Sequence, residues 1–475
     1  MRITMHNLNI IRNKTERSRL LACLMVFAIT LLSACIEIQS SSHGTSRNNT
    51  ADTHKQETGQ AKNVILFIGD GMGVSTITAA RIFDGQSKGM EGEENSLAFD
   101  NFENVALIKT YNTNAQVPDS AGTATAIMSG YKTNIGTINV RPDQKYEGCG
   151  SIPAIKTLTD RSHLAGKSVG IVTTTRITHA TPAAMFAHAD NRNWESDNEV
   201  PKEAKEAGCK SIAQQMVESE AEIIMGGGTS KFSENQLSTL KANYTYAESK
   251  DDMKNFKDGK LRALFSKSHM SFEADRDPAK QPSLAEMTET AIRNLKSNQE
   301  GYVLMVEAGR IDHAHHGTNA FRALTDAQAL NEAVKVAIDM ASEETLIMVT
   351  ADHSHVFTMA GYPVRGNPIL GLVKSIDQTT GLPSNNYEKA LDGKPYTTLG
   401  YHNGPNLRAT NDESLTDEIV HDRNYQQQTA VPMGYETHGG EDVALFGHGP
   451  GSENIRGVME QNKISDIIDL ALGLN

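Results

Sequence analysis

The sequence is short of aromatic residues and of cysteine. Aromatic side chains make up 5% of the 475 residues, with a single tryptophan, and there are four cysteines. A chain of this length buries enough apolar surface to fold without dense disulfide stapling, which excludes the class of small disulfide-rich domains. No internal repeat is present, so the length allows two domains or one large α/β domain with insertions.

Positive charge is also in short supply. The 45 Lys and Arg residues face 58 Asp and Glu residues, which gives a net charge of −13. Residues 1–35 contain five of the basic residues and one acid, so the rest of the chain is more acidic still. Such a surface repels nucleic acid and anionic lipid headgroups, and we expect no nucleic-acid binding. An anionic substrate would need a local positive centre, which bound metal ions can supply.

Long apolar runs are missing apart from one near the N-terminus. The stretch Leu20–Ala34 is too short to span a bilayer and follows a basic segment (Arg12, Lys14, Arg17 and Arg19), as in a signal peptide. It ends Leu32-Ser33-Ala34-Cys35, which is similar to a bacterial lipoprotein signal. We therefore expect residues 1–35 to be a lipoprotein signal peptide with Cys35 lipidated; an ordinary cleaved signal is the alternative.

Export has consequences for the next residues and for the remaining cysteines. The protein is expected in the periplasm or at the cell surface, held by the lipid anchor alone, and Ile36 after Cys35 favours the outer membrane. Residues 36–61 are rich in Ser, Thr, Asn and Gln, which predicts a flexible tether. Cys149 and Cys209 form an even pair in an oxidising compartment, so we expect a disulfide, with two free thiols as the alternative.

Three short apolar runs each end in acids or histidines. The runs are Val64–Ile68, Tyr302–Val306 and Leu346–Val349. Runs of this kind are typical of buried parallel strands, and ligands in open α/β sheets bind beyond the carboxyl ends of the strands. The side chains that follow them, together with one later histidine, are Asp70, Glu307, Asp312, His316, Asp352, His353 and His438. We expect these seven side chains to meet at one edge of a sheet.

The rest of the chain predicts how that sheet is covered. Further strands are expected at Ser168–Thr173 and Glu222–Met225, and helices at Pro282–Leu295 and Ala323–Ala341. The alternation predicts an α/β fold with a doubly wound, mostly parallel central sheet flanked by helices. The polar, turn-rich stretch of about residues 375–431 is expected to be a small surface insertion.

The seven clustered side chains indicate bound cations. Buried, unpaired carboxylates are costly, so a cluster of them requires positive charge. Mixed His and Asp ligation suits zinc, whereas oxygen-only ligation suits magnesium, so two zinc sites and one magnesium site are possible. His315 and His448 are each expected to be an ordinary helix cap or surface charge.

A serine and an arginine elsewhere have the chemistry to meet an anion. Ser120 precedes a run of small residues and is expected at a helix start, where free N–H groups favour an anion; a plain N-cap serine is the alternative. Arg192 lies downstream of the helix start at Thr181-Pro182 and can bind two phosphate oxygens at once; an exposed helix arginine is the alternative.

Five separated motifs give a resemblance to a known family. They are Gly69–Gly73, Asp119–Ala124, Val306–His316, Ala351–His355 and Glu436–Asp442. Their residues and order resemble the alkaline phosphatases from Lys62 to about Gly451, and Val172–Arg176 with Asn191–Trp194 resemble the animal-type branch. The resemblance implies a catalytic domain over residues 62–475, with the insertion at about 375–431 resembling a crown-like dimer-interface subdomain. It implies a homodimer that hydrolyses phosphate monoesters at alkaline pH through a phosphoserine, with two zinc ions and one magnesium ion.

The resemblance also implies roles for individual residues. Ser120 would be the nucleophile, Arg192 the phosphate-binding arginine with Asp119 as its partner, and His355 a residue that steadies a ligand. His179 and His313 would support phosphate binding, at positions where bacterial relatives often carry Asp and Lys. Cys149 and Cys209 match a disulfide of the animal-type branch. The implied ligands are Asp312, His316 and His438 for the first zinc, Asp70, Asp352 and His353 for the second, and Asp70, Thr181 and Glu307 for magnesium.

The sequence departs from the animal-type branch at one metal site, and other protein classes remain as alternative assignments. Phe265-Ser266 and Gln281 stand where the animal-type branch has ligands of a calcium site, so no fourth metal is expected. Sulfatases need a modified Cys or Ser in a motif that is absent around Ser120. Phosphodiesterases usually have a Thr nucleophile and lack the third metal site, for which Thr181 and Glu307 are present here. An inactive metal- or phosphate-binding lipoprotein stays open, whereas a purely structural protein does not explain the clustered ligands.

Overall fold

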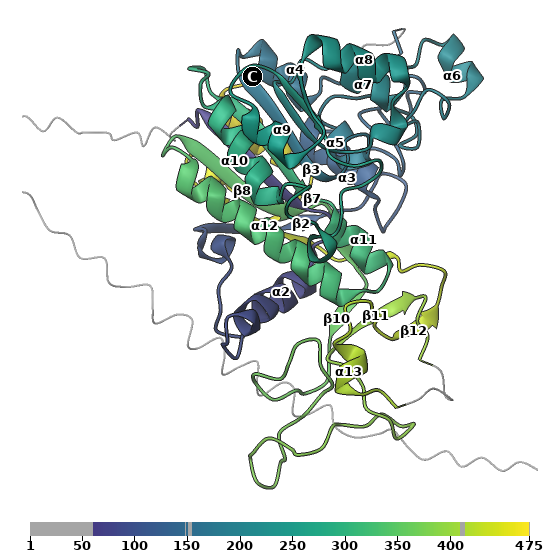
Figure 1. The fold of residues 1–475 in the computed structure, drawn as a ribbon, viewed down its shortest axis with the longest axis vertical. Helices are drawn as coiled ribbons and strands as arrows, with labels where there is room; N and C mark the ends of the chain where they lie inside the picture. Colours follow the sequence, from purple (N-terminus) through teal and green to yellow (C-terminus); the bar gives the residue numbers. More distant parts are fainter. Residues whose placement is uncertain (1–59, 148, 151–153, 409–413, 475) are drawn as a thin grey trace, which may run out of the picture. The chain divides into compact units, whose positions relative to one another are not determined.

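The structure, a computed structural model, describes residues 60–147, 149–150, 154–408 and 414–474 (Figure 1). The predicted signal peptide, Cys35 and residues 36–59 of the predicted tether lie outside this part of the chain. Among the described residues, no helix has the length and apolar character needed to cross a membrane.

A ten-stranded sheet forms the centre of the described part. In sheet order its strands are β15 (Gly457–Glu460), β2 (Asn104–Lys109), β14 (Val443–His448), β8 (Thr345–Ala351), β1 (Asn63–Gly69), β7 (Tyr302–Ala308), β3 (Ser168–Arg176), β4 (Ile223–Gly227), β6 (Leu261–Leu264) and β5 (Thr245–Ala247). Strand β14 runs antiparallel to both neighbours, and the other adjacent pairs are parallel. The predicted mostly parallel α/β sheet is confirmed.

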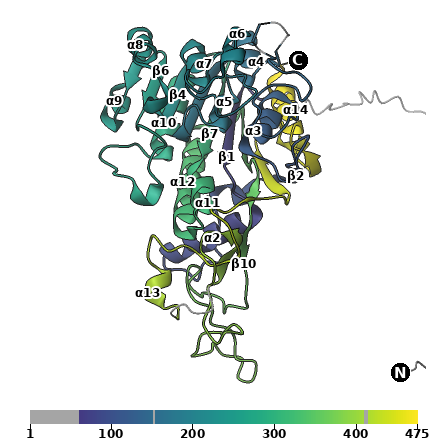
Figure 2. The same cartoon turned by 90° about the vertical axis from the view of Figure 1, so that its right-hand side faces the viewer.

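Helices cover both faces of this sheet. Helices α10 and α12 lie on one side of β1 and β7 and helices α3 and α14 on the other (Figure 2). The helices are α2 (Val74–Ser87), α3 (Ser120–Ser129), α4 (Leu158–Leu164), α5 (Ala180–Ala183), α6 (Lys202–Glu206), α7 (Ile212–Glu218), α8 (Glu234–Asn243), α9 (Lys250–Asn255), α10 (Leu284–Leu295), α11 (Arg310–His316), α12 (Ala320–Met340), α13 (Asp417–Val420) and α14 (Lys463–Leu472). The two predicted long helices correspond to α10 and α12: Leu295 ends α10 as predicted, and the other three ends are shifted by one to three residues.

The three strands predicted to carry ligands are neighbours at the centre of the sheet. β1 lies between β8 and β7, and all residues of the three strands are buried. Gly69 at the end of β1 is level with Ala308 on one side and Ala351 on the other. Because these parallel strands end at the same level, the polar residues at and beyond their ends meet at one edge.

A small second sheet occupies part of the predicted insertion. It contains β10 (Phe357–Met359), β11 (Leu399–Gly404) and β12 (Thr429–Pro432), so it begins upstream of the predicted boundary at residue 375. A two-stranded ladder pairs β9 (Ser354–His355) with β13 (His438–Gly439), which brings His438 beside His355. This ladder carries the late histidine to the edge where the three central strands end.

Candidate functional site

The predicted ligands come together at the carboxyl edge of the sheet, from different elements. Asp70 follows β1, Glu307 is within β7, and Asp352 and His353 follow β8. Asp312 and His316 are one turn apart on α11, and His438 is on β13. All seven side chains are buried except those of His316 and His438, which are partly exposed.

The first group contains Asp312, His316 and His438. Nε2 of His316 and Nε2 of His438 are 3.2 Å apart, and each lies 3.3 Å from Oδ1 of Asp312. The Nδ1 atoms of the two histidines bond to backbone carbonyls, at 2.6 Å to Glu436 and 2.8 Å to Pro118. A carbonyl only accepts, so Nδ1 carries the proton and both Nε2 lone pairs face each other and a carboxylate. Two imidazole nitrogens and a carboxylate oxygen that converge in this way can hold a bound cation.

The second group contains Asp70, Asp352 and His353 and reaches Ser120. Nε2 of His353 lies 3.4 Å from Asp70 Oδ1, 3.5 Å from Asp352 Oδ2 and 3.1 Å from Ser120 Oγ. Nδ1 of His353 donates to the Ser354 carbonyl at 3.2 Å, so its Nε2 is again the free acceptor. Burial, followed by the neighbouring Asp352, raises the pKa of Asp70 well above its usual value, and burial raises that of Asp352. These two carboxylates lack a compensating charge from the protein.

The third group consists of four buried polar atoms without a hydrogen-bond partner. They are Asp70 Oδ2, Glu307 Oε1, Thr181 Oγ1 and His179 Nδ1. The other oxygen of Glu307 accepts from Thr173 and, at 3.2 Å, from Thr175. Burial raises the pKa of Glu307 to about 7. Unsatisfied buried atoms are rare, and the three oxygens fit a bound divalent cation such as magnesium, with the His179 nitrogen beside them.

Ser120 is the first residue of α3, and Asp119 is its N-cap. Asp119 Oδ1 accepts from the backbone N–H of Gly122 at 3.1 Å, while Oδ2 accepts from Arg192 Nη1 at 3.1 Å. Arg192 Nη2 lies 3.0 Å from Nε2 of His179. Asp119 keeps a lowered pKa although burial opposes this, because Arg192 and two backbone N–H groups stabilise its charge. The helix start and the arginine thus face the same space.

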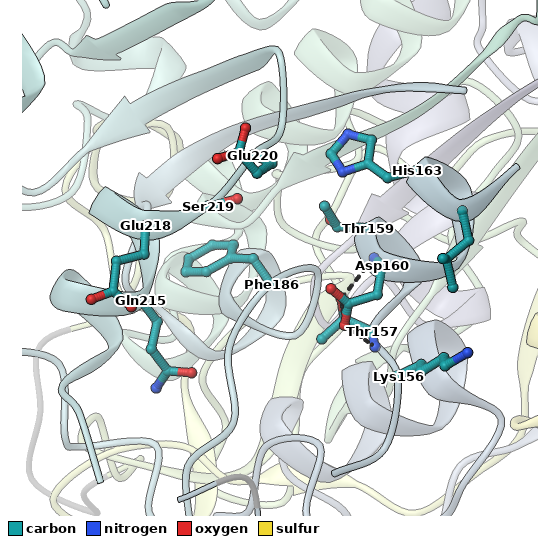
Figure 3. A pocket seen from close by; sticks show the side chains of 11 residues that line it. Lys156, Thr157, Thr159, Asp160, His163, Phe186, Gln215, Glu218, Ser219 and Glu220 are labelled. Carbon is teal, nitrogen blue, oxygen red and sulfur yellow. Dashed lines mark hydrogen bonds between the residues drawn. The ribbon is translucent and has the colours of Figure 1, made fainter. Parts of the chain in front are cut away.

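That space is a cavity of about 300 Å³. It is lined by Ser120, Arg176, His179, Arg192, Asn193, Glu195, Asp312, His313, His316 and His438. The His313 side chain lines this cavity, and its Nδ1 lies 3.0 Å from Nη1 of Arg310. A larger cavity of about 590 Å³, between Lys156 and Glu220, has none of the predicted site residues in its walls (Figure 3). The Ser120 hydroxyl, the Arg192 side chain and the first ligand group therefore all line the smaller cavity.

His355 contacts the first group without having a free nitrogen. Its Nε2 lies 2.8 Å from Asp312 Oδ1 and its Nδ1 lies 2.6 Å from Glu436 Oε2. Burial opposes its charge, but the two carboxylates outweigh burial and raise its pKa to about 10. A histidine that donates from both nitrogens holds a ligand in place and cannot bind a metal itself.

Sequence reasoning missed several residues around the site. Glu436 holds His355 through its carboxylate and His316 through its backbone carbonyl; it begins the motif Glu436–Asp442, but nothing in the sequence assigned it this role. His269 packs against His313 and His179, with ring centroids 4.2 and 5.5 Å apart. No local pattern marks it, because residues far apart in sequence bring these rings together.

The expectation for His315 was wrong, and that for His448 is confirmed. His315 is fully buried and bonds to Thr76 Oγ1 at 3.0 Å and to the Tyr401 hydroxyl at 2.8 Å. The His315 side chain points inward from α11, so its two hydrogen bonds connect this helix to α2 and to β11. His448 is partly exposed and pairs with Glu103 at 2.8 Å.

Comparison with known proteins gives consistent matches over most of the chain. A family model described as alkaline phosphatase matches residues 61–474. The tissue-nonspecific alkaline phosphatase isozyme of Rattus norvegicus is 42% identical over 461 residues, covering 89% of this chain and 86% of the relative. That of Gallus gallus is 44% identical over 442 residues, covering 85% and 83%. The solved alkaline phosphatase from the Antarctic bacterium TAB5 superposes with a TM-score of 0.61 at 25% identity, covering 88% of this chain and 99% of the other.

Proposed function

The chain belongs to the alkaline phosphatase family, and from that premise we propose that it hydrolyses phosphate monoesters through a phosphoserine on Ser120. We further propose two zinc ions in the first and second ligand groups and one magnesium ion in the third. The observation that carries the proposal is the position of Ser120 Oγ, 3.1 Å from His353 Nε2, at a helix start beside Arg192.

The protein's own groups supply orientation and charge for the reaction. Ser120 Oγ attacks the phosphorus, the ester oxygen leaves, and water then cleaves the new Ser120–phosphate bond to release inorganic phosphate. Arg192 and the backbone N–H groups at the start of α3 hold the non-bridging oxygens. When bound, zinc would lower the pKa of the serine hydroxyl and neutralise charge that develops on oxygen. Asp119 keeps the arginine aimed at the phosphate.

The chemistry of the donors supports the metal assignment. The first and second groups offer imidazole and carboxylate, which suits zinc. The third offers Asp70, Glu307 and Thr181 oxygens, which suits magnesium, with His179 beside them. A variant of the Antarctic relative in which a histidine is replaced by aspartate has Mg bound in its M3 site, so a solved relative binds magnesium.

An assay with two substrates tests the function. The purified protein is offered p-nitrophenyl phosphate and the corresponding bis-ester between pH 7 and 10, before and after chelation and restoration of zinc and magnesium. We expect monoester hydrolysis that is lost and regained with the metals. Preference for the bis-ester would assign the chain to phosphodiesterases, and no turnover with zinc bound would favour a binding protein.

We also propose that Cys35 anchors the protein to the outer membrane by a lipid. The signal-like stretch Leu20–Ala34 and the residue Ile36 support this. Expressed in a bacterium, the full chain should sediment with membranes and incorporate labelled palmitate, whereas Cys35→Ala should do neither. Equal membrane association of both forms would contradict the anchor.

A homodimer is the third part of the proposal. It is supported by family membership and by apolar side chains that stand exposed beside one edge of the sheet, Val105 and Leu107 on β2 and Val458 on β15. Sedimentation equilibrium of the lipid-free protein should give twice the mass of its own chain, which is 51.6 kDa with the predicted signal peptide included. A monomer at micromolar concentration would contradict it.

A further inference from the structure

Arg192 lies in a segment, residues 188–195, that has no helix or long strand of its own. Its guanidinium meets Asp119 and His179, but these contacts do not fix where the backbone of the segment lies. A group that clamps a substrate must be held within about 0.5 Å of its working position. The neighbours that fix this backbone therefore bear on phosphate binding.

One neighbour consists of residues 136–147 and Cys149, which we call the front strap. The Arg192 N–H donates to the Gly136 carbonyl at 2.8 Å. Ile138 and Ala189 exchange two backbone hydrogen bonds, at 2.8 and 2.9 Å. The Tyr146 N–H donates to the Asp190 carboxylate at 2.9 Å. The front strap thus holds the segment at residues 189, 190 and 192.

The other neighbour is the segment of residues 209–215, which we call the back strap. The N–H groups of Ile212 and Ala213, at the start of α7, donate to the carbonyls of Trp194 and Glu195 at 2.9 Å each. The Gln215 amide accepts from the His188 N–H at 2.8 Å and donates to the His188 carbonyl at 2.9 Å. The back strap thus holds both ends of the segment.

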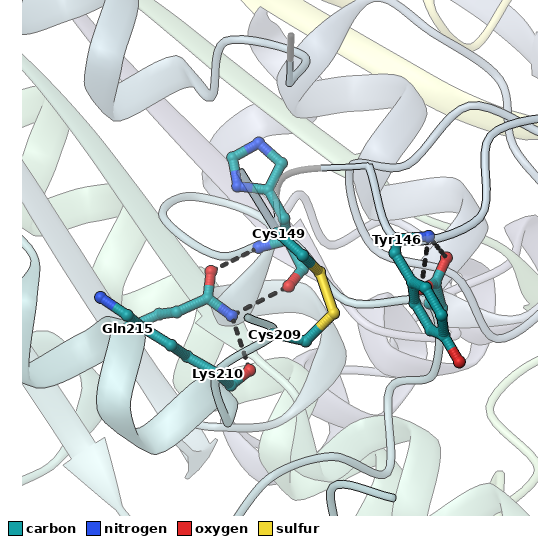
Figure 4. The surroundings of a disulfide bond; sticks show 7 residues. Tyr146, Cys149, Cys209, Lys210 and Gln215 are labelled. Carbon is teal, nitrogen blue, oxygen red and sulfur yellow. Dashed lines mark hydrogen bonds between the residues drawn. A yellow bond between two sulfur atoms is a disulfide. The ribbon is translucent and has the colours of Figure 1, made fainter. Parts of the chain in front are cut away.

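The predicted disulfide is present and joins the two straps. Cys149 ends the front strap, Cys209 begins the back strap, and the two are 60 residues apart with Arg192 between them. Figure 4 shows the bond between Tyr146 on one side and Lys210 with Gln215 on the other. A crosslink that closes this loop removes the freedom of the two straps to separate.

We propose that the Cys149–Cys209 disulfide is a positioning element for Arg192, which it serves by holding the two straps against residues 188–195. The proposal rests on the proposed role of Arg192 in binding phosphate. It assigns the disulfide to substrate binding in addition to stability. Gln215, which binds His188 from the back strap, is a positioning residue for the same segment.

The first test measures phosphate binding by the metal-loaded enzyme without the crosslink. Misplacing a contact residue by about 1 Å can cost up to ~10²-fold, so in Cys149→Ser/Cys209→Ser we expect about a three- to tenfold rise in the KM for p-nitrophenyl phosphate and in the Ki of inorganic phosphate. We expect kcat to change by less than about twofold, because Ser120 and the ligand groups lie on other elements.

A double-mutant cycle with Arg192→Ala separates the inference from its premise. If the disulfide acts through Arg192, its removal should raise the phosphate Ki in the wild-type background and leave it nearly unchanged in the Arg192→Ala background. Equal loss in both backgrounds overturns the inference and leaves the function of Arg192 intact. An unchanged Ki in Arg192→Ala alone overturns that function, and the inference with it.

A matched pair of variants answers the question without removing the crosslink. Gln215→Ala breaks the contact with His188, whereas its neighbour Gln214 contacts Glu218 and Gln236 on another side of α7. Gln215→Ala should raise the phosphate Ki, and Gln214→Ala should not. If the cysteine variant fails to fold, this pair decides: equal effects of the two substitutions overturn the inference.

The chain's one tryptophan gives a readout that does not depend on turnover. Trp194 is buried, two residues after Arg192, and its carbonyl is held by the back strap. Its emission should shift to the red, and acrylamide should quench it more strongly, in the cysteine variant and in Gln215→Ala. Emission identical to that of the wild type in both variants would overturn the inference.

Discussion

Imidazole nitrogens around the site differ in what they contact, and the difference separates the proposed metal ligands from the proposed supporting residues. His316, His353 and His438 direct Nδ1 to a backbone carbonyl and leave Nε2 free. His355 is held at both nitrogens by carboxylates and His315 by hydroxyl groups. The sequence alone predicted that His316, His353 and His438 meet near the strand ends, because they lie in family motifs, and that they are ligands stays a prediction. It could not predict His315, because its burial depends on Tyr401, which lies 86 residues away.

The hydroxyl of Thr181 gives a test at the scale of one residue. Thr181→Val keeps the volume of the side chain and removes a buried oxygen that has no partner in the protein. We expect weaker magnesium binding, by at least about tenfold, as is usual when a supporting or ligating group is lost. Titration of the magnesium-depleted protein, followed by calorimetry and by activity, measures this.

Thr288→Val is the matched control, since Thr288 is also buried but bonds within α10, to the Leu284 carbonyl at 2.8 Å. It should leave magnesium affinity unchanged. If Thr181→Val binds magnesium as the wild type does, the third group is not a magnesium site.

The elements of the site differ in how far local sequence determines them. Strands β1, β7 and β8 were predictable because apolar runs end in acids, and their adjacency follows from the rule for parallel sheets. The start of α3 at Ser120 was predictable from the small residues that follow. The pairing of β9 with β13 was not, because it joins residues about eighty apart through two-residue strands with no periodicity.

Asp119 tests how α3 and Arg192 are coupled. Asp119→Asn keeps a good N-cap but loses the charge that pairs with Arg192, whereas Asp119→Ala loses both. We expect both to raise the KM and the phosphate Ki several-fold. Only the alanine variant should also lower the free energy of unfolding, by about 1 kcal/mol, as urea denaturation would measure.

A phosphate Ki that does not change in either variant would show that Asp119 does not position Arg192. Equal unfolding free energies of the two variants would show that the cap does not depend on the carboxylate or amide oxygen.

At the scale of the whole molecule, the chain concentrates carboxyl groups in its core, where burial raises their pKa values and favours the protonated form when no metal is bound. Asp70, Glu307 and Asp352 are fully buried, and the net charge of the chain is −13. Fold class and site composition were predictable from sequence, because they depend on strand ends and motif order. The network of His269, Arg176 and Glu195 at the cavity wall was not, because tertiary contacts alone assemble it.

Glu307 predicts how the stability of the metal-free protein changes with pH. Its pKa is about 7 in the folded protein and 4.5 is its ordinary value, so the folded state holds a proton that the unfolded state has lost between these values. Stability should therefore fall as pH rises from about 4.5 to about 7, by up to about 1.4 kcal/mol per pH unit. Magnesium should restore it above pH 7.

Urea unfolding of the chelated protein at pH 5 and pH 8 measures this. Glu307→Gln has no charge to bury and should lose less unfolding free energy between the two pH values, by up to about 3 kcal/mol. Glu300→Gln, at an exposed position, should behave as the wild type. Parallel losses in wild type and Glu307→Gln would contradict the burial of an unpaired Glu307 charge.

The central claim is that Ser120 carries the phosphoryl group, and trapping that intermediate tests it most directly. The metal-loaded enzyme is mixed with a phosphorus-radiolabelled monoester, quenched in acid within milliseconds, and digested to locate the label. The account predicts label on Ser120 in the wild type, and neither label nor appreciable turnover in Ser120→Ala with its metals still bound. Label on another residue, or turnover that persists in Ser120→Ala, would contradict it.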